Sequence, residues 1–154
     1  MTLHFAYGSN MSRALMASRC PGAQGLGIAT LLGWRFVING EGFGSIARDR
    51  GGRVLGVLWR LSPRDVAAIN AYESVTTGLY VRRTLPVRSG ARHTTALVYM
   101  TRQGGQGWGR PSYIDLVVRA AREWELPEGY IESLARWSPS GWRGARAKDT
   151  GEVG

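Results

Sequence analysis

The sequence has few of the residues that support thiol or metal chemistry. Its 154 residues contain one cysteine, Cys20, and two histidines, His4 and His93. A single cysteine cannot form an internal disulfide bond, and its scarcity favours a reducing cytoplasmic location. Cys20 stands beside Pro21 with no obvious base to activate a thiol. The histidines have no third ligand in view, so we expect no metal site.

Long apolar runs are also absent. No stretch approaches the roughly 20 apolar residues of a membrane span. The N-terminal residues lack the charged start and apolar segment of a secretory signal. We therefore expect no association with a membrane. A chain of this length, with 44% hydrophobic residues and six tryptophans, suits one globular domain.

Positive charge is abundant, but lysine is nearly missing. The formal net charge is +9, and Lys148 is the one lysine among 20 basic residues. The arginines are scattered, and only Arg82 and Arg83 are adjacent. No known nucleic-acid-binding motif accompanies them, so we expect no nucleic-acid partner. The basic surface favours small anionic substrates instead.

Apolar periodicity predicts an α+β domain with five to six strands. Strands are expected at residues 3–7, 28–39 (one bent or two short), 53–61, 79–88 and 93–101. Helices are expected at residues 12–16, 62–72, from 112 onward, and after Pro127. Regular β-α-β alternation is missing, which argues against a doubly wound parallel sheet. A small mixed β-barrel with external helices fits this order better.

Capping residues predict where two helices begin, and composition predicts where the domain ends. Ser62 at the N-cap, Pro63 at the first position and Asp65 at the third predict one helix start. That helix is expected to bury Val66, Ile69 and Ala67. Ser112 with Asp115 predicts another capped start. Residues 1–137 form the expected domain, and 138–154 an expected flexible basic tail.

A first candidate site follows the opening strand. The strand ends in Gly8, Ser9 and Asn10, and Ser12 then caps a helix. Such a junction directs backbone N–H groups at one point, where an anion or a polarised carbonyl can bind. Gly8 has no side chain to block the approach. An ordinary edge turn is the alternative interpretation.

A second candidate is Glu73, which follows the end of the helix 62–72. Its neighbours Tyr72, Val75, Leu79 and Tyr80 are apolar or aromatic. Desolvation by such groups would raise the pKa of the carboxyl group, as a general base acting on an amine requires. The alternative is a solvated glutamate, although the C-terminal end of a helix disfavours an anion.

Together these segments resemble the γ-glutamylcyclotransferase family. The resemblance rests on the heptapeptide FAYGSNM at 5–11, Tyr72-Glu73 with GLYVR at 78–82, Pro-Ser-Tyr at 111–113 and the LPxxYIxxL segment at 126–134. It covers about residues 3–137. It implies the small mixed β-barrel already favoured and a reaction without metal or cofactor. In that reaction a γ-glutamyl amide becomes 5-oxoproline and a free amine.

The resemblance also implies roles for individual residues. Glu73 would be the general acid and base. The substrate would bind to the first segment and to one tyrosine hydroxyl, that is, to Phe5, Ala6, Tyr7, Gly8, Ser9, Asn10 and Tyr113. Two positions depart from the family pattern. Ser74 stands where glycine is common, and His4 stands where an aromatic residue is expected.

More than one substrate and function is compatible with the sequence. The substrate could be a γ-glutamyl amino acid, a γ-glutamyl amine or a γ-glutamyl-protected intermediate. The glycine-rich segments 40–45 and 103–111 are candidate gates. A non-catalytic member that binds a small metabolite or a protein partner is the alternative function. The protein could be a monomer or a homodimer.

Overall fold

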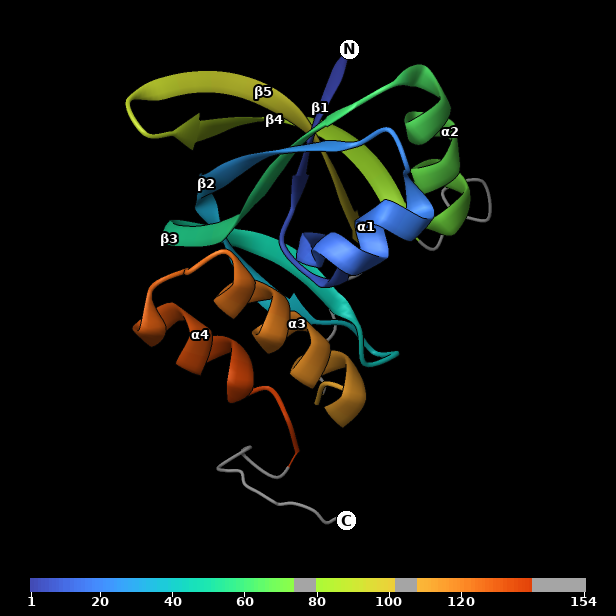
Figure 1. Ribbon diagram of the computed structural model, residues 1–154. Helices are drawn as coiled ribbons and strands as arrows, with labels where there is room; N and C mark the ends of the chain where they lie inside the picture. Colours follow the sequence, from blue (N-terminus) through green and yellow to red (C-terminus); the bar gives the residue numbers. More distant parts are fainter. Residues whose placement is uncertain (74–79, 102–107, 140–154) are drawn as a thin grey trace.

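Five strands form a closed barrel in this computed structural model, which describes residues 1–73, 80–101 and 108–139 (Figure 1). The strands are β1 (Thr2–Ala6), β2 (Gln24–Ile38), β3 (Gly44–Leu61), β4 (Tyr80–Ser89) and β5 (Arg92–Thr101). The helices are η1 (Ser9–Met11), α1 (Arg13–Arg19), α2 (Pro63–Tyr72), α3 (Pro111–Glu123) and α4 (Glu128–Ala135). The small mixed barrel with external helices is confirmed.

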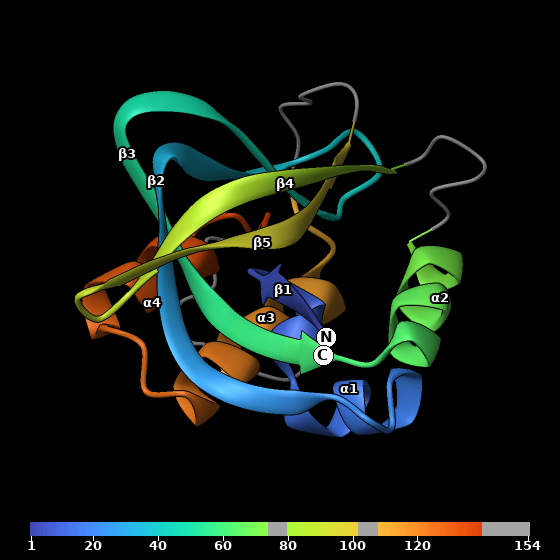
Figure 2. The same cartoon turned by 90° about the horizontal axis from the view of Figure 1, so that it is seen from above.

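The barrel runs in the order β1-β3-β2-β4-β5 and mixes strand directions (Figure 2). β1 pairs antiparallel with β3, and β4 pairs antiparallel with β5 as a hairpin. Closure comes from the parallel contact of β1 with β5 at His4 and Leu97. β1 therefore lies between β3 and β5, and its C-terminal end leads directly into the first candidate segment.

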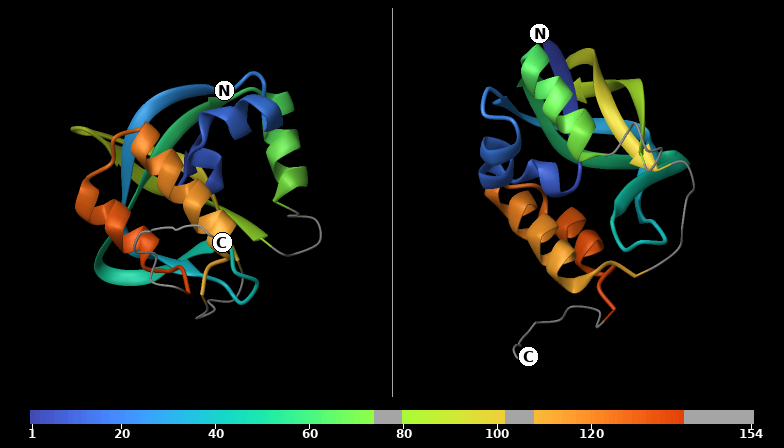
Figure 3. Two further views of the ribbon diagram at one scale, coloured as in Figure 1. Left: turned by 60° about the horizontal axis from the view of Figure 1, so that its bottom comes forward. Right: turned by 90° about the vertical axis from the view of Figure 1, so that its right-hand side faces the viewer.

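The helices cover the barrel from outside. α3 and α4 lie against each other beneath it in Figure 1, while α1 and α2 lie at one side (Figure 3). Both groups are attached to the barrel through buried apolar side chains, including Phe5, Met11, Met16, Leu61, Ile69, Ile114, Val117, Ile131 and Leu134. This packing brings η1 between the barrel and α3.

Two strands are longer than the sequence pattern predicts. β2 begins at Gln24, inside an expected loop, and β3 begins at Gly44, well before the expected residue 53. The added part of β3 is residues 44–52. Residues 44–46 are buried, whereas 47–52 are exposed or half-buried and have no apolar alternation. Pairs with β2 stand at its two ends, Arg48 opposite Trp34 and Arg53 opposite Leu32, and a register shift lies between them. Register shifts in β2 bend this long ribbon around the barrel.

The predicted cap of α2 is confirmed, and the predicted cap of α3 is wrong. In α2, Ser62 and Asp65 form the reciprocal capping box, with Pro63 in the first turn. Ile69 is buried and Val66 half-buried, but Ala67 is exposed. In α3, Arg110 occupies the N-cap without a side-chain hydrogen bond. Pro111 occupies the first helical position, where a missing N–H costs nothing and the fixed φ suits a helix, so α3 begins before Ser112.

Buried side chains continue through α4 and just past its C-terminal end. Ile131 and Leu134 are buried in α4, and Ser138 is buried just after it. The N–H of Ser138 donates to the carbonyl of Ala135. The rest of the predicted tail, 140–154, lies outside the described residues. Within the described part of the chain, no helix is both long and apolar enough to cross a membrane.

Candidate active site

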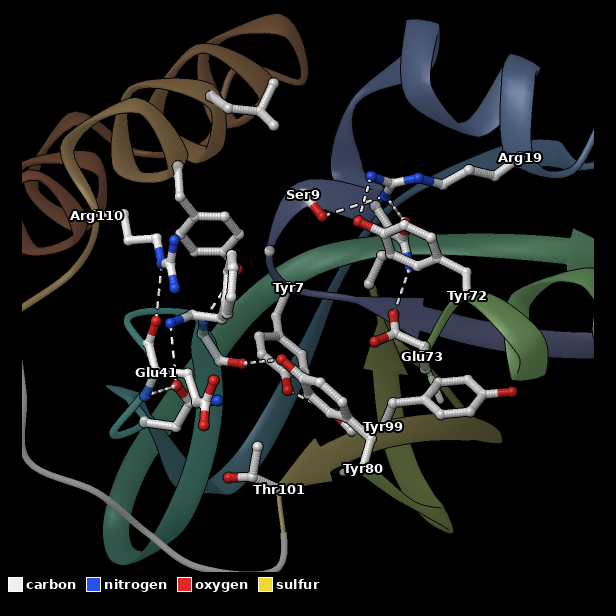
Figure 4. Close-up of a pocket in the computed structure, with 18 of the residues that line it drawn as sticks. Tyr7, Ser9, Arg19, Glu41, Tyr72, Glu73, Tyr80, Tyr99, Thr101 and Arg110 are labelled. Carbon is white, nitrogen blue, oxygen red and sulfur yellow. Dashed lines mark hydrogen bonds between the residues drawn. The ribbon is translucent and has the colours of Figure 1, made fainter. Parts of the chain in front are cut away.

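A pocket of about 710 Å³ opens where β1, α2 and α3 meet (Figure 4). All eight residues predicted from the sequence line it: Phe5, Ala6, Tyr7, Gly8, Ser9, Asn10, Glu73 and Tyr113. Glu73 is the C-cap of α2, as predicted, and is 63 residues from Asn10 in the chain. The fold therefore brings the two candidate segments to one place. Ser74 lies outside the described residues.

Asn10 holds the carboxylate of Glu73. The Nδ2 atom of Asn10 donates to Oε2 of Glu73 at 3.0 Å. Asn10 is itself buried in the turn formed by η1. The opening segment therefore contributes a side-chain donor to the site in addition to the backbone groups expected from the sequence.

Arg19, at the end of α1, connects both segments. Its Nη1 donates to the Oγ of Ser9 at 3.2 Å and to the Oδ1 of Asn10. Its Nη2 donates to the hydroxyl of Tyr72, and the guanidinium lies 3.6 Å from the centre of the Tyr72 ring. An amide that accepts through oxygen must donate through nitrogen. Arg19 thus fixes the face of Asn10 that meets Glu73.

The surroundings of Glu73 raise the pKa of its carboxyl group. Burial raises the pKa of its carboxyl group from 4.5 to about 7. The positive charge of Arg19 and the hydrogen bond from Asn10 act in the opposite direction. Near neutral pH the carboxyl group can therefore both accept and donate a proton, which a general acid and base requires. The raised pKa expected from the sequence is confirmed.

A hydrogen bond from the barrel also holds the C-terminal end of α2 in place. The hydroxyl of Tyr99 donates to the side chain of Asn70, one turn before Glu73. Burial raises the pKa of Tyr99 to about 12, so the donor stays protonated. With Arg19 bound to Tyr72, α2 is held from β5 and from α1. Glu73 is therefore carried by an anchored helix end.

Tyr113 reaches the pocket from α3 and lies beside two glycines. The Gly44 N–H donates to its hydroxyl oxygen at 3.1 Å. A Cβ atom added at Gly8 would stand 2.6 Å from that oxygen, and one added at Gly44 would stand 2.7 Å from it. Both contacts are too short for a side chain. Burial raises the pKa of Tyr113, which keeps its proton in place for donation.

The side chains of Phe5, Ala6 and Tyr7 are part of the barrel core. All three are buried, and the Tyr7 hydroxyl donates to the carbonyl of Tyr99. Burial is the main cause that raises the pKa of Tyr7. Their side chains stabilise the strand end that presents the Gly8–Asn10 turn.

His4 lines the same pocket as a neutral ring. It is 2% exposed, and burial lowers its pKa from 6.5 to about 4. Its Nδ1 lies 3.2 Å from the carbonyl of Leu97, so Nδ1 carries the hydrogen. Its Nε2 is then an acceptor that has no partner among the described residues. The ring also meets Tyr99 edge to face.

The opposite rim is made by the segment from Asn39 to Gly44 together with Arg110. Asn39 Oδ1 accepts the N–H groups of Glu41 and Phe43, which closes the turn. Both glycine-rich segments named from the sequence therefore contribute residues to the pocket. Residues 102–107 lie outside the described residues.

Cys20 is not among the residues that line this pocket. Cys20 is buried, and burial raises the pKa of its thiol to about 11. Among the residues that the structure describes, no group of three or more histidine, cysteine or acidic side chains could hold a metal ion.

Sequence reasoning missed Arg19 and Arg110 as site residues. Arg19 follows Asn10 by nine residues and contacts Tyr72 across 53 residues. Arg110 contacts Glu41 across 69 residues. Neither arginine stands out locally among the 20 basic residues. The available signals were weak. Arg110 lies inside the glycine-rich segment 103–111, and Arg19 follows the first candidate segment.

Comparison with known proteins agrees with this geometry. The model of the AIG2-like family matches residues 53–134, more than half of the chain. The gamma-glutamylcyclotransferase of Mus musculus is 27% identical over 92% of this chain and 81% of its own. The gamma-glutamylcyclotransferase of Homo sapiens is 24% identical over 98% and 86%.

A solved structure titled gamma-glutamyl cyclotransferase shares the fold. It superposes with a TM-score of 0.81 at 24% identity, over 99% of this chain and 93% of its own. The matched family segment contains α2, Glu73 and Tyr113, and the similarity to the Homo sapiens protein, over 98% of this chain, extends to the opening segment. The chain therefore belongs to the AIG2-like family and is similar to proteins named gamma-glutamylcyclotransferase.

Proposed function

We propose that this protein is a γ-glutamylcyclotransferase, which converts a γ-glutamyl amide into 5-oxoproline and a free amine. The observation that carries the proposal is Glu73, whose carboxyl group has a pKa of about 7 and is held by Asn10 in the pocket. The relatives named gamma-glutamylcyclotransferase support the same reaction class.

In this proposal the substrate reacts with itself. Glu73 takes a proton from the α-ammonium group, and the freed α-nitrogen attacks the γ-carbonyl carbon. The new C–N bond closes a five-membered ring and leaves negative charge on the carbonyl oxygen. The bond to the leaving nitrogen then breaks as Glu73 returns a proton to that nitrogen. The α-nitrogen loses two protons and the leaving nitrogen gains two, so no proton is consumed.

The remaining residues would hold and polarise the substrate. Tyr113 accepts the Gly44 N–H through its oxygen, so its own proton can be donated to a substrate oxygen. The backbone of the Gly8–Asn10 turn would add donors for the developing negative charge. Binding in the pocket would keep the flexible γ-glutamyl chain folded, which matters because orientation controls an intramolecular attack.

The substitution Glu73→Gln tests the proposal. We expect it to fold and to lower 5-oxoproline release about 100-fold or more, since the amide cannot exchange a proton. The assay measures 5-oxoproline from γ-glutamyl-alanine, a γ-glutamyl amine and glutathione. Glu132→Gln, an exposed change on α4, is the matched control and should retain wild-type turnover.

Two results would contradict the proposal. Wild-type turnover in the Glu73→Gln variant would remove Glu73 from the chemistry. Tight binding of γ-glutamyl compounds in calorimetry without any 5-oxoproline would favour the non-catalytic alternative.

A further inference from the structure

Tyr99 is a buried residue of β5 that contacts both parts of the pocket. It is 3% exposed, and it lines the pocket together with Glu73 (Figure 4). Its carbonyl accepts a hydrogen bond from the hydroxyl of Tyr7, which directly follows β1. Its own hydroxyl donates to the side-chain oxygen of Asn70 in α2. One residue therefore joins the strand before the Gly8–Asn10 turn to the helix that carries Glu73.

The direction of the Tyr99 hydroxyl is set by Arg82. The two residues are directly paired in the β4–β5 hairpin. Burial raises the pKa of Tyr99 to about 12, while the positive charge of Arg82 and a hydrogen bond from its side chain act in the opposite direction. A guanidinium can only donate, so the phenol oxygen accepts from Arg82 and its proton is left for Asn70. Arg82, the last residue of the GLYVR segment, is not among the residues that line the pocket.

Asn70 connects this contact to Glu73. Asn70 precedes Glu73 by three residues, so both side chains lie on one face of the last turn of α2. The Glu73 N–H closes that turn by donating to the carbonyl of Ile69 at 2.9 Å. Glu73 is the C-cap, a position at which helices fray. A hydrogen bond from the barrel to Asn70 therefore restricts the movement of Glu73.

This support is separate from the support that Arg19 gives. Arg19 acts from α1, on the side chain of Asn10 and on the hydroxyl of Tyr72. Tyr99 acts from β5, on the helix turn that precedes Glu73. A general acid and base must lie within hydrogen-bond reach of the nitrogen whose proton it takes or returns. A small displacement of the carboxyl group therefore slows proton transfer.

We propose that Tyr99 is a positioning residue, which fixes the carboxyl group of Glu73 for proton transfer. Its hydroxyl acts through Asn70 and does not contact the reacting atoms. This inference rests on the proposed function and adds a residue to its mechanism. Because the groups that would bind the substrate remain when the hydroxyl is removed, Tyr99 should affect kcat and leave substrate binding nearly unchanged.

The substitution Tyr99→Phe removes the hydroxyl and keeps the ring, which meets His4 edge to face. The assay uses whichever of the γ-glutamyl compounds named above gives the highest wild-type turnover. We expect kcat to fall about tenfold, because a misplaced catalytic group slows an intramolecular reaction. KM should stay within about twofold of the wild-type value. Asn70→Ala should give the same pattern.

A double-mutant cycle separates positioning through Asn70 from general damage. Tyr99→Phe and Asn70→Ala remove the two ends of one hydrogen bond, so the double variant should lose no more kcat than either single variant. Tyr130→Phe, which removes a hydroxyl from a half-buried residue of α4 outside the pocket, is the matched control and should change neither kcat nor KM. Losses that multiply in the double variant, or a rise in KM with unchanged kcat, would overturn the inference.

Amide hydrogen exchange measures the support of the helix end without any substrate. In Tyr99→Phe the Glu73 amide should exchange about two- to tenfold faster, as expected for the loss of one hydrogen bond. The Val66 amide, which donates to the carbonyl of Ser62 in the first turn of α2, should keep its wild-type rate. An unchanged rate at Glu73 would contradict the inference.

A failure of the proposed function would be distinguishable. If the wild type releases no 5-oxoproline from any of the γ-glutamyl compounds, the cyclotransferase reaction is wrong. Exchange at Glu73 then decides alone: a faster rate in Tyr99→Phe supports the positioning of Glu73, and an unchanged rate contradicts it. If the wild type is active and Tyr99→Phe keeps full kcat, the proposed function stands and the inference about Tyr99 is wrong.

Discussion

At the residue scale, the site depends on a relay of three side chains. Arg19 holds the oxygen of the Asn10 amide, and the nitrogen of that amide meets Glu73. Burial alone favours the protonated carboxyl group, while Arg19 and Asn10 favour the carboxylate. The resulting pKa of about 7 is a balance, so a change at Arg19 should be read out as a change in pH dependence.

Replacing Arg19 by glutamine should raise the pKa of Glu73, because a nearby positive charge is lost. The proposed base must be ionised to act. The rise of kcat/KM with pH should therefore have its midpoint at a higher pH than the value of about 7 expected for the wild type. The loss of kcat/KM at pH 6 should then exceed the loss at pH 8. Arg64→Gln, an exposed change on α2, should leave the profile in place. An equal loss at every pH would mean that Arg19 acts on structure alone.

At the scale of elements, the site depends on how closely η1 approaches α3. Gly8 begins η1, and the Tyr113 hydroxyl from α3 stands where a Cβ atom of residue 8 would be. The same hydroxyl oxygen accepts the N–H of Gly44 at the start of β3. One hydroxyl group thus lies at the meeting point of three elements.

Gly8→Ala should therefore destabilise the protein by about 1–3 kcal/mol through overpacking. In a Tyr113→Phe background the nearest atom is the ring Cζ at 3.8 Å, an ordinary contact. The cost of Gly8→Ala should largely disappear there, and urea denaturation of the four proteins in this cycle measures it. Gly129→Ala, at an exposed position with free space in α4, is the control and should not destabilise. An undiminished cost in the phenylalanine background would show that the hydroxyl is not the obstacle.

Elements with strong local signals were predictable from the sequence. The Ser62–Asp65 capping box defines α2, and alternating residues define the β4–β5 hairpin. The exposed part of β3, residues 47–52, was not predictable, because it has no apolar alternation and belongs to the strand through the β2 pairs on either side of it. For the site, the resemblance brought Glu73 together with the opening segment. Arg19 and Arg110 were missed because their partners meet them only through tertiary packing.

At the scale of the whole molecule, two buried titratable groups shape stability in opposite ways. Glu73 has a raised pKa, so the folded state holds its proton more tightly than the unfolded chain. Its stabilising contribution to the free energy of unfolding is full below pH 4.5 and is lost as pH rises through about 7. His4 has a lowered pKa, so its contribution is lost as pH falls from 6.5 toward 4. Between pH 4.5 and 6.5 the two effects oppose each other.

In the Glu73→Gln variant, the pH dependence of stability that comes from His4 should no longer be offset by Glu73. The variant should gain stability relative to the wild type by about 3 kcal/mol between pH 4.5 and 7, from 1.36 kcal/mol per pKa unit. The variant alone should also weaken on acidification from pH 6.5 to 4. Urea denaturation across this range provides both curves. A constant difference between the two proteins at all pH values would be inconsistent with a raised pKa at Glu73.

The central claim is that the α-nitrogen of the substrate displaces its own leaving group. The most direct measurement is the mass balance of the products from γ-glutamyl-alanine, with 5-oxoproline, glutamate and alanine quantified in one reaction. We predict one 5-oxoproline for each alanine released and no glutamate. Glutamate in place of 5-oxoproline would show attack by water and would contradict the account.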